Sequence, residues 1–116
     1  MSEIQSIHKV LSTHRFPVHN EKQLQTDIAF IFERSGISYI REHILDNNNI
    51  IDFMSGDIGV EVKIKGNKKA IYLQCERYCD FPGIKSLLLI TNRSMGFPKQ
   101  INGKDCYVLN LGKAWL

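Results

Sequence analysis

Residues 50–64 combine two apolar runs with a turn signal between them, and this pattern predicts a β-hairpin. Gly56-Asp57 separates the two runs and is typical of a tight turn, and Ser55 before it also suits a turn. A two-residue turn then sets the cross-strand pairs, which are Ser55–Ile58, Phe53–Val60, Asp52–Glu61, Ile51–Val62 and Ile50–Lys63.

Because strand side chains alternate between the two faces of a sheet, this hairpin has one apolar face. That face fixes the register of the hairpin, since a slip by one residue would expose it to water. Its expected members are Ile51, Phe53, Val60, Val62 and Ile64.

The opposite face of the hairpin carries Asp52, Glu61 and Lys63. Asp52 and Glu61 would stand opposite each other with Cβ atoms roughly 5 Å apart, a distance at which like charges destabilise a sheet. A shared divalent cation would offset the repulsion, and carboxylate oxygens suit Mg²⁺ or Mn²⁺. Lys63 could then orient or help deprotonate a water molecule, or stabilise charge on a phosphate.

The alternative is an ordinary hairpin whose polar face is solvated. The apolar character of the segment predicts a position inside the sheet, and this favours the metal site over a solvated face.

The chain has 116 residues, enough for a single domain (residues 1–116) with one hydrophobic core. No apolar run is long enough to cross a membrane as a helix. The first residues lack a basic segment followed by an apolar one, so we expect no signal peptide and an intracellular protein. The formal net charge of +3 permits nucleic-acid binding without requiring it.

The chain contains three cysteines, Cys75, Cys79 and Cys106. An odd number without a secretory signal predicts reduced thiols. Cys75 and Cys79 stand one helical turn apart and could share a metal, but a four-ligand site would need a histidine and none has a convincing spacing. We therefore predict buried free thiols.

Outside the hairpin, apolar periodicity predicts helices over residues 3–13, 20–36 and 70–80 and strands over residues 37–45, 86–91 and 103–109. Ser2 and Asn20 are expected N-caps, and Gly36 is expected to end the second helix. Trp115 is expected at the edge of the core. A helix between the hairpin and residues 86–91 makes that strand parallel to the second hairpin strand.

These elements predict an α/β fold, in which an antiparallel meander plus a parallel strand form a mixed sheet flanked by helices. Their order, with Asp52 followed by Glu61-Val62-Lys63, resembles the PD-(D/E)xK nuclease superfamily and its restriction-endonuclease-like fold. That motif places an acid near the end of the second core strand and (Asp/Glu)-x-Lys on the third. The resemblance covers residues 20–91, and Ile51 stands in place of the motif's proline, which many members also lack.

Three further positions fit the same superfamily. Glu21 stands where members often carry a glutamate on the first core helix, close to the metal. Gln74 and Tyr78 match a Gln-x-x-x-Tyr pattern on the crossover helix of several branches, which include archaeal Holliday-junction resolvases and stand-alone virus-type nuclease domains.

The resemblance implies a Mg²⁺- or Mn²⁺-dependent enzyme that hydrolyses phosphodiester bonds in DNA. Asp52, Glu61 and the carbonyl of Val62 would bind the metal, and Glu21 would do so directly or through water. Lys63 would position the attacking water, and Gln74 would hold Lys63 or a phosphate. The expected contacts to the DNA backbone come from Tyr78, from Lys65, Lys68 and Lys69, and from Arg41 or His43.

A second interpretation is a non-catalytic module of the same fold that binds nucleic acid or acts with a catalytic partner. A pure protein-interaction domain would leave the carboxylate pair unexplained. The small core has no separate specificity domain, so we expect cleavage guided by DNA structure, as in repair or recombination, rather than by sequence. A homodimer would supply two sites for two strands.

Overall fold

The structure is a computed structural model that describes residues 1–112, so the expected position of Trp115 lies outside the described residues. Within this range, no helix is long and apolar enough to span a membrane. The elements, in chain order, are α1 (Glu3–Ser12), α2 (Glu21–Arg34), β1 (Ile40–Asp46), β2 (Asn49–Ser55), β3 (Ile58–Lys63), α3 (Lys68–Tyr78), β4 (Ser86–Thr91), β5 (Gln100–Ile101) and β6 (Lys104–Asn110).

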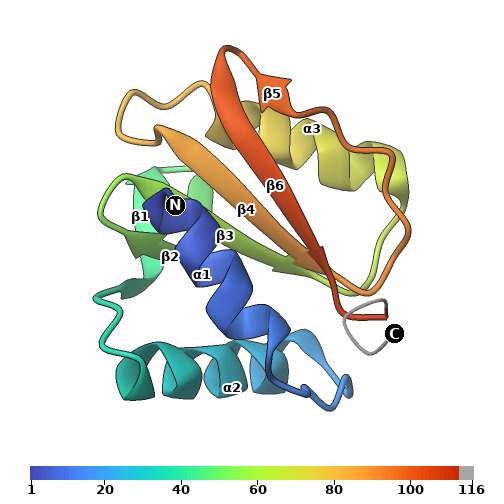
Figure 1. Cartoon of the computed structure of the whole chain (residues 1–116). Coiled ribbons are helices and arrows are strands. Elements are labelled where there is room, and N and C mark those ends of the chain that lie inside the picture. The colour runs from blue at the N-terminus through green and yellow to red at the C-terminus, as the bar shows by residue number, and fades with distance from the viewer. Residues whose placement is uncertain (113–116) are drawn as a thin grey trace.

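The strands form one mixed sheet in the order β1-β2-β3-β4-β6-β5. The β1–β2 and β2–β3 pairs are antiparallel, whereas β4 runs parallel to both β3 and β6. Helices α1 and α2 cover one face of the sheet and α3 covers the other (Figure 1). The predicted α/β class, with a meander plus a parallel strand, is therefore confirmed, while the short strand β5 was not predicted.

Polar caps set the starts of the three helices. The side chains of Ser2, Asn20 and Asn67 each accept a hydrogen bond from the backbone N–H three residues later. The first two caps are the predicted ones, and the third starts α3 at Lys68, two residues earlier than expected. Gly36 follows α2 with a φ of 71°, a conformation that glycine adopts without a steric penalty.

Strand β4 lies in the middle of the sheet and is buried on both faces. Leu87 and Leu89 belong to the apolar cluster under α3, whereas Leu88 and Ile90 belong to the cluster under α1 and α2. All four side chains have no exposed surface. The continuous apolar run thus forms the buried parallel strand that the sequence predicted.

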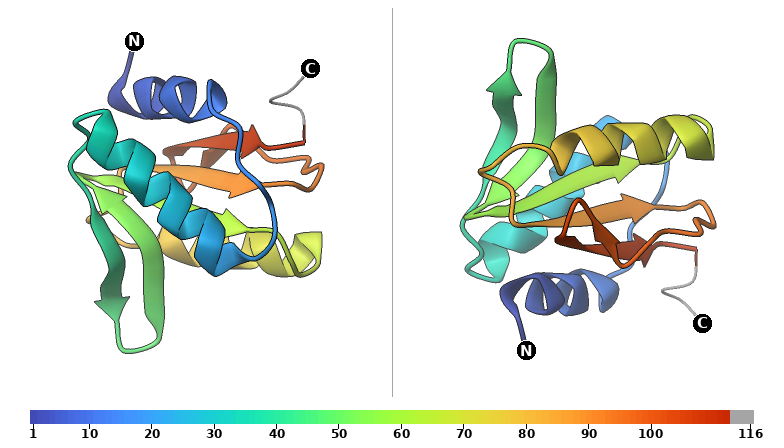
Figure 2. Two further views of the ribbon diagram at one scale, coloured as in Figure 1. Left: turned by 90° about the horizontal axis from the view of Figure 1, so that it is seen from below. Right: turned by 90° about the horizontal axis from the view of Figure 1, so that it is seen from above.

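The β1–β2 hairpin bends away from the sheet at Glu42. This residue has a φ of 54°, and the strand pairs Arg41–Phe53 and His43–Ile51 lie on either side of it. The β2–β3 ladder contains the pairs Ser55–Ile58, Met54–Gly59 and Phe53–Val60, and it ends there. Beyond this point the hairpin projects from the body of the protein on the side of α3 (Figure 2).

Because of this bend, two predictions about the hairpin are wrong. The expected pairs Asp52–Glu61, Ile51–Val62 and Ile50–Lys63 are not part of the β2–β3 ladder. Ile51 does not share a face with Phe53, Val60 and Val62, because it packs in the cluster under α3. Gly59 makes room for it, since a Cβ atom there would lie 2.7 Å from Ile51 Cδ1.

We predict that Phe53→Ala lowers the free energy of unfolding by about 3–5 kcal/mol, because a fully buried aromatic ring leaves a cavity. Phe53 contacts the rings of Phe32 and Tyr39 edge-on or nearly so. Urea denaturation measures the change. The control is Phe30→Ala, since Phe30 is 55% exposed and its loss should have a much smaller effect. Equal losses for the two variants would contradict this placement of Phe53.

Candidate functional site

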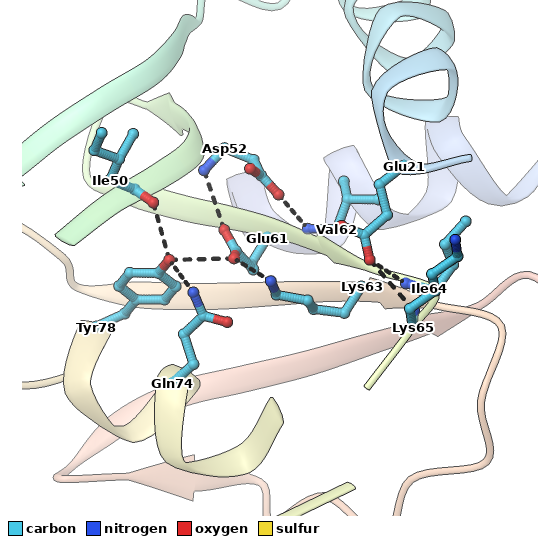
Figure 3. Close-up of polar contacts among 10 residues, drawn as sticks. All are labelled: Glu21, Ile50, Asp52, Glu61, Val62, Lys63, Ile64, Lys65, Gln74 and Tyr78. Carbon is cyan, nitrogen blue, oxygen red and sulfur yellow. Dashed lines mark hydrogen bonds and ion pairs between the residues drawn. The ribbon is translucent and has the colours of Figure 1, made fainter. Parts of the chain in front are cut away.

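Two carboxylates meet where β2 separates from β3, and they bond to the backbone across the gap. The backbone N–H of Asp52 donates to Glu61 Oε1 at 3.1 Å, and the N–H of Val62 donates to Asp52 Oδ2 at 2.8 Å (Figure 3). Because buried N–H groups need an acceptor, each carboxylate takes the place of a missing ladder carbonyl. The bend that ends the ladder thereby brings the two acids together.

Burial makes this pair of acids difficult to ionise together. Glu61 is 2% exposed and Asp52 is half-buried. Burial, followed by the nearby Asp52 charge, raises the pKa of Glu61 to about 8. Burial also raises the pKa of Asp52. At neutral pH the pair of carboxyl groups therefore keeps one proton and carries a single negative charge, unless a bound cation neutralises the second charge.

Tyr78 and Gln74 connect α3 to this pair. The Tyr78 hydroxyl lies 3.1 Å from Glu61 Oε2 and 3.0 Å from the carbonyl oxygen of Ile50, either of which can accept its single proton. Gln74 Nε2 donates to the same hydroxyl at 2.8 Å. The network fixes one oxygen of Glu61 and joins α3 to both β2 and β3 (Figure 3).

Lys63 supplies the cation nearest to the two acids. Its Nζ lies 3.8 Å from Glu61 Oε2, and its side chain is 26% exposed. The Lys63 charge acts to lower the pKa of both Asp52 and Glu61, but this effect is smaller than that of burial. Lys63 is therefore a partly exposed ammonium beside a buried acid, as the polar face of the hairpin predicted.

Glu21 lies close to this site but is engaged elsewhere. Its Oε1 accepts hydrogen bonds from the backbone N–H groups of Ile64 at 2.9 Å and Lys65 at 3.3 Å. Its charge contributes to the raised pKa of Asp52. Within residues 1–112, no three His, Cys, Asp or Glu side chains form a ready metal-binding group. The site therefore offers two assembled carboxylates and a third one held by the backbone.

Two of the expected DNA contacts differ from the prediction. The hydroxyl of Tyr78 is occupied within the protein, and the residue is only 1% exposed, so it positions Glu61 rather than a phosphate. Arg41 Nη2 donates to Thr26 Oγ1 at 3.2 Å and approaches the carbonyl of Lys22 at 3.4 Å. Arg41 therefore anchors β1 to α2, because the bent strand lies over that helix.

Of the remaining predicted site residues, the three lysines and His43 are at least partly exposed. Lys65, Lys68 and Lys69 are exposed between the end of β3 and the first turn of α3. His43 is half-buried on β1. Gln74 contacts Tyr78 and not the expected Lys63. The contact of Lys63 with water, and of the Val62 carbonyl with a metal, stay predictions.

Sequence reasoning missed the carbonyl of Ile50 as a partner of Tyr78. It also missed the bend at Glu42 that brings this carbonyl over α3. A glutamate with a positive φ has no sequence signature, since this conformation is imposed by the surrounding structure.

Comparison of the chain with protein-family models, with curated proteins and with solved structures finds no match. The interpretation of this site therefore depends on the arrangement of its side chains and on the motif that they resemble.

We predict that the protein loses stability as the pH rises from about 4.5 to about 8 in the presence of EDTA. Folded Glu61 binds its proton up to a pKa of about 8, whereas the ordinary value is 4.5. Its contribution to stability is therefore complete below the ordinary pKa and disappears as the pH rises through the folded one. The expected loss is on the order of 5 kcal/mol, which corresponds to roughly 20 °C in Tm.

Thermal unfolding of Glu61→Gln measures this effect, because a neutral amide cannot lose the proton. The variant should keep its Tm between pH 5 and pH 9 better than the parent protein. Glu3→Gln is the control, since Glu3 is exposed on α1 and should leave the pH profile unchanged. Identical pH profiles for the parent and Glu61→Gln would show that Glu61 ionises normally.

Proposed function

We propose that this protein is a metal-dependent nuclease that hydrolyses phosphodiester bonds in DNA. The observation that carries the proposal is the meeting of Asp52 and Glu61 at the end of the β2–β3 ladder, with Lys63 Nζ 3.8 Å from Glu61. Two acids and a lysine in this order on two adjacent strands are the motif of the PD-(D/E)xK superfamily.

The donor set fits a hard divalent cation. Asp52 and Glu61 present carboxylate oxygens, the ligands that Mg²⁺ and Mn²⁺ prefer. Burial is the main cause of the raised pKa values of both acids, followed for Glu61 by the charge of Asp52, and a bound cation would stabilise the ionised forms that burial disfavours. A bound Mg²⁺ would lower the pKa of a water molecule and neutralise charge on the scissile phosphate.

The chain's own residues would perform the remaining tasks. Asp52 and Glu61 would hold the metal, with the Val62 carbonyl and Glu21 as further ligands. Glu21 would have to release the N–H groups of Ile64 and Lys65 to reach it directly, so a water-mediated contact costs less. Tyr78 and Gln74 would hold Glu61 in place, and Lys63 would orient the attacking water.

The substrate surface would extend from Lys63 to the start of α3. Lys65, Lys68 and Lys69 are exposed there, and such a group of lysines attracts the phosphate backbone without reading the base sequence. This supports a structure-guided nuclease, with a branched, nicked or single-stranded substrate. A homodimer would bring two such sites to two strands.

A second candidate function is a nucleic-acid-binding module without catalysis, active alone or beside a catalytic partner. It is favoured by the backbone bonds of Glu21, which leave only two assembled carboxylates among the described residues. Such a module would use the same lysines and would not need a metal.

We predict that Mg²⁺ or Mn²⁺ binds at pH 8 with one site per chain and that Asp52→Asn abolishes this binding. Removing one of two carboxylates leaves too few charged ligands for a hydrated divalent cation. Isothermal titration calorimetry measures the binding. Asp57→Asn is the matched control, because Asp57 lies exposed in the β2–β3 turn. Binding that survives in Asp52→Asn, or no binding by the parent protein, would contradict the metal site.

We predict that the protein cuts at least one of single-stranded, duplex or four-way-junction DNA with Mg²⁺ or Mn²⁺ and none with EDTA. Lys63→Ala should reduce cutting by a factor of about 100 or more while metal still binds, since general acid–base and positioning effects reach this size. Lys9→Ala, on exposed α1, is the control. DNA binding without cutting of any substrate would favour the non-catalytic module.

A further inference from the structure

A pair of thiols lies at the C-terminal end of α3, where Tyr78 contacts the candidate site. Cys79 follows the last residue of α3 and Cys106 lies on β6, 27 positions later in the chain, yet their Sγ atoms are 3.8 Å apart. Both residues belong to the apolar cluster between α3 and the sheet. A disulfide has an S–S bond of about 2.05 Å, so a movement of under about 2 Å would join the two sulfur atoms.

A cavity gives small solutes access to Cys106, one member of this pair. It has a volume of about 850 Å³ and lies between β6 and the segment before β5, with walls that include Met95, Phe97 and Cys106. Cys106 is 7% exposed, whereas Cys79 is 1% exposed and does not line the cavity. An oxidant the size of hydrogen peroxide can therefore reach Cys106, whose Sγ atom lies 3.8 Å from that of Cys79.

The three thiols differ in their tendency to ionise. The hydrogen bond shared with Cys106 lowers the pKa of Cys79, and the charge of Lys104 acts in the same direction. The same bond raises the pKa of Cys106, which keeps its proton. Burial raises the pKa of Cys75 to about 12 and makes it a poor nucleophile. Because the thiolate is the reactive form, Cys79 is the thiol prepared for attack.

We propose that Cys79 and Cys106 are a redox-responsive dithiol that closes to a disulfide in the folded protein when hydrogen peroxide oxidises it. The Cys79 thiolate attacks one peroxide oxygen, the O–O bond breaks, and the released hydroxide takes a proton to become water. Cys106 sulfur then attacks the Cys79 sulfenic acid. The S–O bond breaks, and the departing hydroxide takes the Cys106 proton. Two thiols and one peroxide thus give one disulfide and two waters.

The bond would tie the end of α3 to β6 at the residue next to Tyr78. Because the Tyr78 hydroxyl contacts Glu61, oxidation would reduce the freedom of α3 beside the two acids. Formation of the disulfide does not require the proposed nuclease activity, so either proposal can fail without the other.

The test is to treat the full folded chain with hydrogen peroxide, block free thiols and map the peptides without reduction. We expect the loss of two hydrogen atoms, a peptide pair joined through Cys79 and Cys106, and Cys75 blocked as a free thiol. Tm should rise by about 10 °C, as expected for closing a loop of this length, and should fall back on reduction.

The variants give a second measurement. Cys75→Ser should form the same disulfide, and Cys106→Ser should instead accumulate a sulfenic acid on Cys79 that dimedone traps. A bridge through Cys75, bridges only between chains, or oxidation of Cys79 to sulfinic acid in the parent protein would each overturn the proposal. The peptide map of the parent protein needs no variant, so it decides the question even if a serine variant fails to fold.

Discussion

The reciprocal bonds between two carboxylates and two backbone N–H groups are the contact on which the centre of this structure depends. Where β2 leaves β3, the N–H groups of Asp52 and Val62 would otherwise lose their ladder partners inside the protein. An unpaired buried donor costs about 1–3 kcal/mol, so Glu61 and Asp52 support the fold as well as forming the candidate site. Removal of either acid therefore disturbs both the fold and the candidate site.

Because the two acids serve both the fold and the candidate site, opposing interactions act on the charge of Glu61. The backbone N–H of Asp52 and the charge of Lys63 favour a charged Glu61, whereas burial and the charge of Asp52 disfavour it. The protein accommodates the conflict with a proton and a lysine at 3.8 Å rather than with a close ion pair. Strongly shifted pKa values of this kind cluster at functional sites.

Local patterns predicted most of the fold. The capping residues Ser2 and Asn20, the turn at Gly56 and the apolar run of β4 each act within a few residues, so their chemistry can be read directly from the chain. Asp52, Glu61 and Lys63 lie close together as predicted, although Asp52 and Glu61 are linked by side-chain bonds to the backbone beyond the end of the ladder and not by the predicted ladder pair.

The predictions that were wrong have a common cause in long-range contacts. Ile51, Arg41 and Tyr78 were misplaced or misassigned because their partners come from distant elements that the bend at Glu42 brings near. The contact between Cys79 and Cys106 likewise requires β6 to lie beside β4, a pairing for which the sequence carries no local signal. Tertiary geometry, rather than weak patterns, set the limit of prediction here.

The bend at Glu42 also bears on how the protein avoids self-association. Strand β1 is an edge of the sheet, and it exposes Ile40 and Ile44, with Ile50 beside it on β2. A long, flat, apolar edge is a template for adding further chains, as in amyloid. The positive φ at Glu42 interrupts the regular backbone within the seven residues of β1, and the strand at the opposite edge, β5, is only two residues long. The edge at β1 therefore lacks the straight, regular row of backbone groups that aggregation requires.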